Sequence, residues 1–200
     1  MLIQKIIFAC ILFLFVPVMA LGETTGLELN VNASDVEGKF EFRLPDYEAD
    51  IMPGAGVLFS DDNYLVSNVN ISIRDQILSP ALLLGVGFKG TFGTVEKPNS
   101  GGNYDLGAFG FLLIGEYDFR QDPNVAVPVS LVATFSGSPD PLCFMDTERF
   151  FDFTFTVYGH IIKNASILAG YRHLNFHFGE NADEVTVNDN AVFVGCKLHF

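Results

Sequence analysis

The last eleven residues of the chain, NAVFVGCKLHF (190–200), place alternate side chains on one apolar face. This follows because successive side chains of a β-strand point to opposite sides of the strand. The apolar positions are Val192, Val194, Cys196, Leu198 and Phe200. The stretch therefore predicts a closing β-strand with an apolar face and a terminal aromatic residue.

A terminal strand of this kind resembles the closing strand of bacterial outer-membrane β-barrels. We therefore interpret Phe200 as an assembly signal, with the barrel-assembly machinery as the partner that reads the C-terminal strand. The expected localisation is the bacterial outer membrane, and outer-membrane lipid is the expected surrounding.

Period-two alternation recurs along residues 23–200, and an apolar period of 3.6 residues never holds over a helix length. The chain is therefore expected to be all-β. The alternating segments are Leu27 to Ala33, Lys39 to Leu44, Ala55 to Phe59, Leu65 to Asp75, Leu82 to Phe92, Asp105 to Phe119, Val125 to Ser136, Phe150 to Ile161, Ala165 to Phe178 and Asn190 to Phe200. Ten segments predict a single antiparallel up-and-down transmembrane β-barrel, with eight strands as the alternative. Pro128 lacks an amide donor and predicts a bulge within its segment.

Composition favours a membrane barrel over a water-soluble one. The chain is 49% hydrophobic with a mean hydropathy of +0.32, yet it carries no second long apolar run. In a transmembrane barrel the lipid-facing residues are spread as alternating single positions. A soluble exported barrel with its apolar face inward remains open, because alternation alone fits it equally well.

The N-terminus predicts a cleaved signal peptide over residues 1–22, followed by a barrel domain over residues 23–200. Lys5 precedes an apolar run from Ile6 to Val16, and small residues stand around Ala20 and Gly22. This apolar run is shorter than the roughly 20 residues that a spanning helix needs.

The mature chain is strongly acidic. Residues 1–22 hold one basic residue, Lys5, and no acidic one, so 10 basic and 24 acidic residues remain, with a net charge of −14. Nucleic acid is excluded as a partner, because phosphate binding needs a basic surface. Two cysteines, Cys143 and Cys196, remain, and nothing in the sequence brings them together.

The connections between segments differ in length. If the N-terminus lies at the periplasmic side, the outward connections 94–104, 137–148 and 179–189 are long. The inward connections near 76–79, 120–124 and 162–164 are short, and Pro45 to Pro53 is an exception. Long external loops and short periplasmic turns are typical of outer-membrane barrels.

With the apolar face toward lipid, twelve polar side chains are expected to face the lumen. They are Glu28, Lys39, Glu41, Arg43, Arg74, Lys89, Glu116, Asp118, Asp152, His160, Lys197 and His199. We expect a structural polar core of paired or hydrated charges, because a barrel of this size is barely wider than the eight-stranded kind that side chains fill. A narrow conducting pore is the second interpretation and catalysis the third.

Catalytic, cofactor and metal residues are not assigned. Asp152 and His160 share a strand face but stand about 26 Å apart at roughly 3.3 Å per residue. Ser130 lacks the local signature of a nucleophile elbow. His173 and His177 are interpreted as lumen or rim residues, and the acidic loops lack the spacing of a calcium loop.

One segment conflicts with this pattern. The apolar set Leu168, Leu174, Phe176 and Phe178 also contains Arg172, which places an arginine on the nominal lipid face. That position costs about 2–4 kcal/mol at the bilayer midplane. We expect either that Arg172 snorkels near an interface or that a bulge switches the face locally.

The same region resembles the C-terminal half of the YfaZ family of bacterial outer-membrane proteins. The stretches that carry the resemblance are NASILAGYRHLNF (164–176) and DEVTVNDNAVFVGCKLHF (183–200). Cys196 and His199 depart from the residues expected there. The resemblance implies a small outer-membrane barrel made with a signal peptide, and it supplies no catalytic residue.

The expected function is therefore that of a small, non-enzymatic outer-membrane barrel, without a cofactor, that is structural or interacts through acidic external loops. The external partner is left unknown. A narrow porin-like channel is the alternative, and a lipid-modifying outer-membrane enzyme or a soluble exported ligand-binding barrel follows behind it.

Overall fold

The computed structural model describes residues 25–45, 49–61, 64–97, 102–125, 127–180 and 183–200. The predicted signal peptide, residues 1–22, lies outside these residues. Among the described residues, no helix has the length and apolarity to cross a bilayer.

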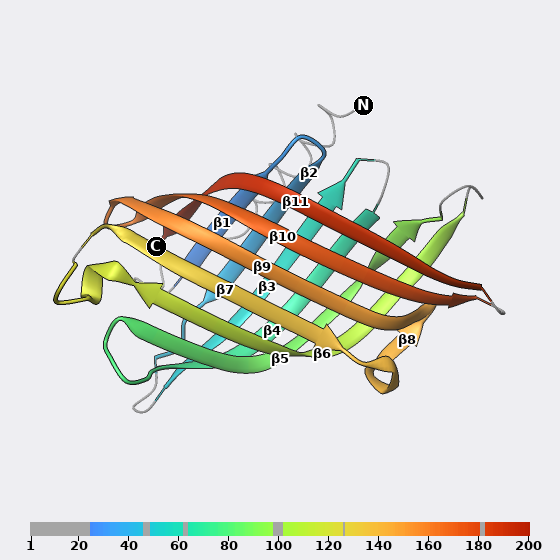
Figure 1. The fold of residues 1–200 in the computed structure, drawn as a ribbon, viewed down its shortest axis with the longest axis horizontal. Coiled ribbons are helices and arrows are strands. Elements are labelled where there is room, and N and C mark those ends of the chain that lie inside the picture. The colour runs from blue at the N-terminus through green and yellow to red at the C-terminus, as the bar shows by residue number, and fades with distance from the viewer. Residues whose placement is uncertain (1–24, 46–48, 62–63, 98–101, 126, 181–182) are drawn as a thin grey trace.

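Antiparallel strands close into a ring, which confirms the predicted ten-stranded barrel (Figure 1). Its strands are β1 (Thr25–Val31), β2 (Asp35–Phe42), β3 (Asp50–Ser60), β4 (Tyr64–Gln76), β5 (Leu82–Glu96), β6 (Asn103–Asp118), β7 (Val129–Ser138), β9 (Thr147–Ile162), β10 (Ala165–Glu180) and β11 (Asp183–His199). The ring follows sequence order, and β11 pairs with β1 to close it. A short strand, β8 (Cys143–Met145), pairs with β6 beyond the end of β7.

Strand β1 meets β11 in six residue pairs, from Gly26 opposite His199 to Val31 opposite Val194. Thr25 N–H donates to the Phe200 carbonyl at 3.2 Å, and Phe200 N–H donates back to the Thr25 carbonyl at 2.9 Å. We call this end of the barrel the terminus end and the opposite end the far end. In Figure 1 the β10–β11 hairpin reaches the far end at the right of the view.

The outer wall carries an apolar belt. Alternate side chains of β4 and β5, such as Val69 (56% exposed) and Val86 (60% exposed), project from the barrel wall. On the terminal strand Val192, Val194 and Phe200 are likewise exposed. The apolar face predicted for these strands therefore points outward.

Strand β10 reverses this arrangement at the far end. Arg172, Leu174, Phe176 and Phe178 are all buried inside, as are Ser166 and Leu168 at the same alternate positions, and only Gly170 among these positions is partly exposed. The prediction that this set faces lipid is wrong, and neither snorkelling nor a face-switching bulge is needed. The physical reason is that the outward side chains of this segment, His173, Asn175 and His177, are polar, so its apolar side chains lie inside, as in a soluble barrel.

The predicted contrast between long outward and short inward connections is also wrong. Pairing of β10 with β11 continues to Glu180 opposite Asp183, so most of 179–189 is strand rather than loop. At the terminus end, residues 119–128 separate β6 from β7 and include a 3₁₀ turn, η2 (Phe119–Gln121). The far end is therefore extended mainly as sheet.

Pro128 and the two cysteines lie apart from one another in the barrel. Pro128 lies just before β7, not in a bulge, and its carbonyl accepts from His160 N–H at 2.8 Å. Cys143 lies in β8 at the far end, whereas Cys196 is exposed in the part of β11 that pairs with β1. Both cysteines are free.

Gly195 provides a test of the seam between β1 and β11. A Cβ atom at this position would lie 2.3 Å from the Leu29 carbonyl and 2.4 Å from Asn30 Oδ1. We expect Gly195→Val to lower the free energy of unfolding by about 1–3 kcal/mol, because overpacking displaces the neighbouring backbone. The measurement is urea unfolding of the barrel refolded in vesicles.

The matched control is Cys196→Val, which adds a similar side chain on the exposed outer face. Its unfolding midpoint should stay close to that of the unaltered protein. Equal losses for the two variants would contradict the close approach of strands at the seam.

Candidate functional site

The barrel interior is the candidate site, and its lining changes along the axis. A polar cavity lies at the terminus end, ion pairs lie in the middle, and an apolar cluster fills the far end. Each layer is built from inward-facing side chains that alternate with the outer belt.

The terminus-end cavity has a volume of about 510 Å³. Its walls include Gln76 and Gln121, which lie at connections of the terminus end, so the cavity opens there. Inside it, Glu41 accepts from Arg74 at 2.5 Å and pairs with Lys197 at 3.3 Å. This carboxylate therefore joins cations from β4 and β11.

A second cavity of about 120 Å³ lies deeper in the barrel and shares lining residues with the first. Lys89 of β5 pairs with Asp152 of β9 at 2.5 Å across the interior. In the same cavity, Glu28 of β1 pairs with Lys39 of β2 at 3.4 Å and accepts from the Tyr158 hydroxyl of β9 at 2.7 Å. Opposite charges are thus matched where water access is limited.

The structure places all twelve polar side chains named from the sequence along these two cavities. Those along the terminus-end cavity are Arg43, Asp118, His160 and His199; those along the deeper cavity are Glu28, Lys39, Lys89 and Asp152; those along both are Glu41, Arg74, Glu116 and Lys197. The sequence did not indicate which of them meet, because cross-barrel pairing depends on strand register.

A charged cluster centred on Arg172, which is 2% exposed, lies on the far-end side of the deeper cavity. Its guanidinium lies 2.6 Å from Asp35, 3.6 Å from Glu37 and 3.7 Å from Asp189. The Tyr64 hydroxyl also donates to Asp189 at 2.5 Å. This cluster was missed in the sequence, because the alternation had placed Arg172 outside.

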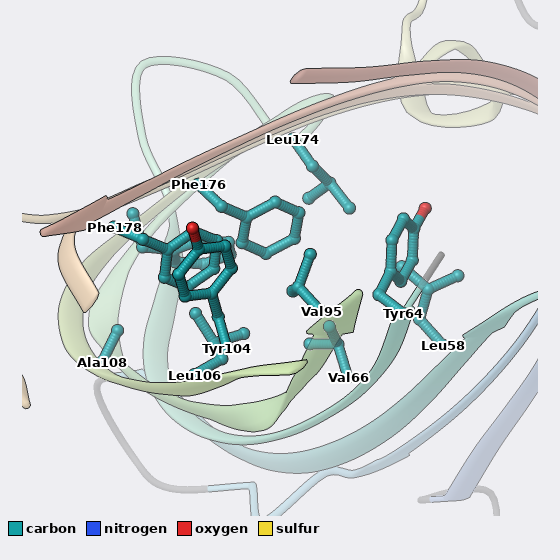
Figure 2. Packing of buried hydrophobic residues seen from close by; sticks show 11 residues of the cluster. Leu58, Tyr64, Val66, Val95, Tyr104, Leu106, Ala108, Leu174, Phe176 and Phe178 are labelled. Carbon is teal, nitrogen blue, oxygen red and sulfur yellow. The ribbon is translucent and has the colours of Figure 1, made fainter. Parts of the chain in front are cut away.

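The far-end interior is closed by an apolar cluster. It comprises Leu58, Tyr64, Val66, Val95, Tyr104, Leu106, Ala108, Phe150, Leu174, Phe176 and Phe178. Figure 2 shows the β10 side chains pointing across the interior toward those of β4, β5 and β6. Tyr104 stacks on Phe178 with ring centroids 4.5 Å apart, and Phe176 and Phe178 are both 0% exposed. The lumen is therefore filled at this level.

A serine–histidine contact lies on the wall of the terminus-end cavity. His160 Nε2 lies 2.9 Å from Ser130 Oγ, and His160 Nδ1 lies 2.8 Å from Ser166 Oγ. The nearby Asp118 carboxylate is paired with Arg120 at 2.7 Å. The third member of this arrangement is therefore a hydroxyl, which orients the ring but carries no charge to stabilise an imidazolium.

The other histidines named from the sequence lie elsewhere. His173 and His177 alternate with the buried β10 side chains and contact Asn190 and Thr186, at 2.8 Å and 2.7 Å. Of the two positions expected for these histidines, lumen or rim, the lumen is therefore wrong, because they face outward on the far-end part of β10. Among the described residues, no group of three or more His, Cys, Asp or Glu is placed to hold a metal ion.

A pKa shift outside the strands is found at the connection between β6 and β7. The Tyr117 hydroxyl donates to Asp122 at 2.5 Å, and this hydrogen bond lowers the pKa of that carboxyl. Asp122 therefore stays ionised to lower pH than a free aspartate.

Among the solved chains that match this protein are the following two. One, from a study of the in-meso crystallization of membrane proteins, is 14% identical, with 88% of this chain and 83% of that chain covered and a TM-score of 0.43. The other, OccK11 (OpdR) of Pseudomonas aeruginosa, is 10% identical, with 87% and 63% covered and a TM-score of 0.30.

Both TM-scores lie below 0.5, so the description of the barrel rests on its strand pairing. No family model matches the sequence, and no curated protein matches it either. The resemblance to the YfaZ family stays a prediction.

Arg172 supplies a test of the interior. Arg172→Leu removes the cation that three carboxylates share, and the uncompensated buried charge should cost about 3–5 kcal/mol of the free energy of unfolding. Arg43→Leu is the control, because its partner Asp50 and its own side chain, 54% exposed, can be hydrated. That change should cost no more than about 1 kcal/mol. Urea unfolding that gives the two variants the same midpoint would argue against a buried cluster.

Proposed function

We propose that this chain is a closed β-barrel of the bacterial outer membrane, which spans the bilayer with its apolar belt and presents its far end outside the cell. The observation that carries the proposal is the combination of an apolar outer wall with a filled far-end interior. Because the lumen is closed there, the task assigned to the protein is structural or that of an outward-facing binding surface, not general diffusion.

The outer wall supports membrane insertion over the soluble alternative. A soluble barrel turns its apolar face inward, but Val69, Ile71 and Ile73 on β4 are each more than half exposed. Strand β4, which carries these residues, is paired with β3 on one side and β5 on the other. No backbone edge is therefore exposed in this part of the wall, as contact with the hydrocarbon core of a bilayer requires.

The outer face of the far end supports its placement in water. His173, Asn175 and His177 face outward on β10, in line with exposed Asn188 and Asn190 of β11. Exposed acidic side chains also gather at this end, at Asp61, Glu96, Asp105, Asp140 and Asp146. A partner that approaches this end therefore meets a polar, acidic surface.

A narrow channel is the second candidate, and the two polar cavities favour it. The cavities admit water or small polar solutes from the terminus end. Passage through the barrel would require the Arg172 cluster and the packed rings around Phe176 to separate. The closed barrel is the better supported function, because Arg172, Phe176 and Phe178 are almost fully excluded from solvent.

The conductance of the barrel tests this choice. Purified protein that runs with heat-modifiable gel mobility, and is therefore folded, should give no step-like conductance after insertion into planar bilayers. Regular single-channel steps from the folded barrel would contradict the closed lumen and support the channel. Protein that stays a monomer without detergent would remove the membrane assignment itself.

Orientation is tested by labelling whole cells with a membrane-impermeant maleimide. The background variant replaces Cys143 and Cys196 with serine, and single cysteines are then introduced as Asp140→Cys at the far end or Asn124→Cys at the terminus end. We expect the far-end cysteine to be labelled in intact cells and the other only after lysis. The reverse pattern would overturn the proposed orientation.

A further inference from the structure

The seam between β1 and β11 leaves one strand edge open. Strand β11 pairs with β10 along its whole length, but it pairs with β1 only from Val194 onward. Within the part of the chain that the structure describes, Asp183–Phe193 therefore has a backbone neighbour on one side alone. In Figure 1 this stretch of β11 runs on toward the far end, past the short strands β1 and β2.

The direction of the unpaired groups follows from the seam itself. Phe200 exchanges both backbone hydrogen bonds with Thr25 of β1, so even-numbered residues of β11 direct their N–H and C=O groups toward the β1 side. Beyond Val194 these groups meet no other strand of the described residues. The residues concerned are Glu184, Thr186, Asn188, Asn190 and Val192.

The open edge lies where water can reach it. Unpaired backbone groups are not tolerated in hydrocarbon. The outward side chains along the edge change accordingly, from Val192, which is 73% exposed, to Asn190, Asn188 and Thr186. An edge of this length in water is a template for an additional strand.

The inward side of the edge carries both apolar and acidic groups. Val185 and Val187 pack against the far-end apolar cluster. Next along the strand, Asp189 is 29% exposed and shares the guanidinium of Arg172 with Asp35 and Glu37. Glu37 also pairs with Lys39 at 3.2 Å, and Lys39 in turn contacts Glu28 at 3.4 Å, so four carboxylates share two cations. Negative charge is therefore in excess beside the open edge, and a cation brought by a ligand would be matched there.

We propose that the open edge of β11, Asp183–Phe193, binds an extended basic peptide segment of a partner protein as an added β-strand. Backbone hydrogen bonds to the even-numbered residues supply the attachment. An apolar side chain of the peptide lies beside Val187, and a lysine or arginine lies beside Asp189. This inference rests on the proposed orientation, which makes the far end accessible from outside.

A second copy of the chain fits this edge poorly. Two barrels inserted in one membrane have the same orientation, so a two-fold axis along the membrane normal leaves their β11 strands parallel to each other. An antiparallel ladder between the two copies would require one barrel to be inserted in the opposite orientation. Like charges at Asp189 of both copies would also oppose the contact.

The edge is tested with a pair of variants at Asn188. Asn188→Pro removes the N–H group that points to the open side, and proline is tolerated at such an edge position. Asn188→Ala removes the same side chain, including its contact with Asn175, but keeps the N–H group. A difference between the two variants therefore reports the backbone edge and not the side chain.

A random library of ten-residue peptides on phage is panned against the full barrel in lipid nanodiscs, and enriched peptides are measured by fluorescence anisotropy. We expect basic sequences with alternating β-branched residues. Their dissociation constants should rise about tenfold for Asn188→Pro and stay unchanged for Asn188→Ala. Asp189→Asn should weaken the basic peptides and not their lysine-to-glutamine versions.

Two results would overturn the inference: no enrichment over empty nanodiscs, or equal affinity for the Asn188→Pro and Asn188→Ala variants. Heat-modifiable mobility and the absence of conductance are measured on the same preparation. The closed barrel can therefore stand when the peptide site fails, and a conducting barrel can still show or lack the site.

Discussion

The proposed membrane placement makes one requirement decisive for the whole architecture: backbone N–H and C=O groups must find partners inside the protein wherever lipid surrounds it. Pairing of β1 with β11 meets this requirement from Thr25 and Phe200 up to Val31 and Val194. At this seam the pairing stops beyond Val194, where the outward side chains soon change to asparagine and threonine. The end of β1–β11 pairing and the change from apolar to polar outward side chains therefore mark the same boundary of the apolar belt.

The lining of the interior follows from what lies outside it. Within the apolar belt, many inward positions are charged, and low dielectric makes an unmatched charge costly, so Lys89 meets Asp152 and Lys39 meets Glu28. At the far end the outer face is polar, and the interior is packed with aromatic rings instead. Arg172 lies at the change between these two layers and holds carboxylates from β2 and β11.

The number of strands and their outer face were predictable from the sequence, because period-two alternation survives in almost every segment. Alternation alone does not say which face is inside, and β10 was therefore assigned the wrong way round. Arg172 was the available signal, since a charge in an otherwise apolar set argues that the set faces inward. The stretch 179–189 was mistaken for a loop because strand residues that face water are also polar. The contact of Arg172 with Asp35 joins residues 137 positions apart, and only the register of the closed ring brings them together.

The short strand β1 makes the far-end rim uneven, and side chains hold the rim together where backbone pairing stops. Arg172 bridges β10 to Asp35 at the start of β2, and Tyr64 of β4 reaches Asp189 of β11. These contacts lie on the inward side of the sheet, whereas the unpaired N–H and C=O groups lie in its plane. A strand added to the edge would consequently compete with water rather than with the Arg172 cluster. The barrel can keep its interior closed while its edge is occupied, so closure and outward binding are compatible in one small fold.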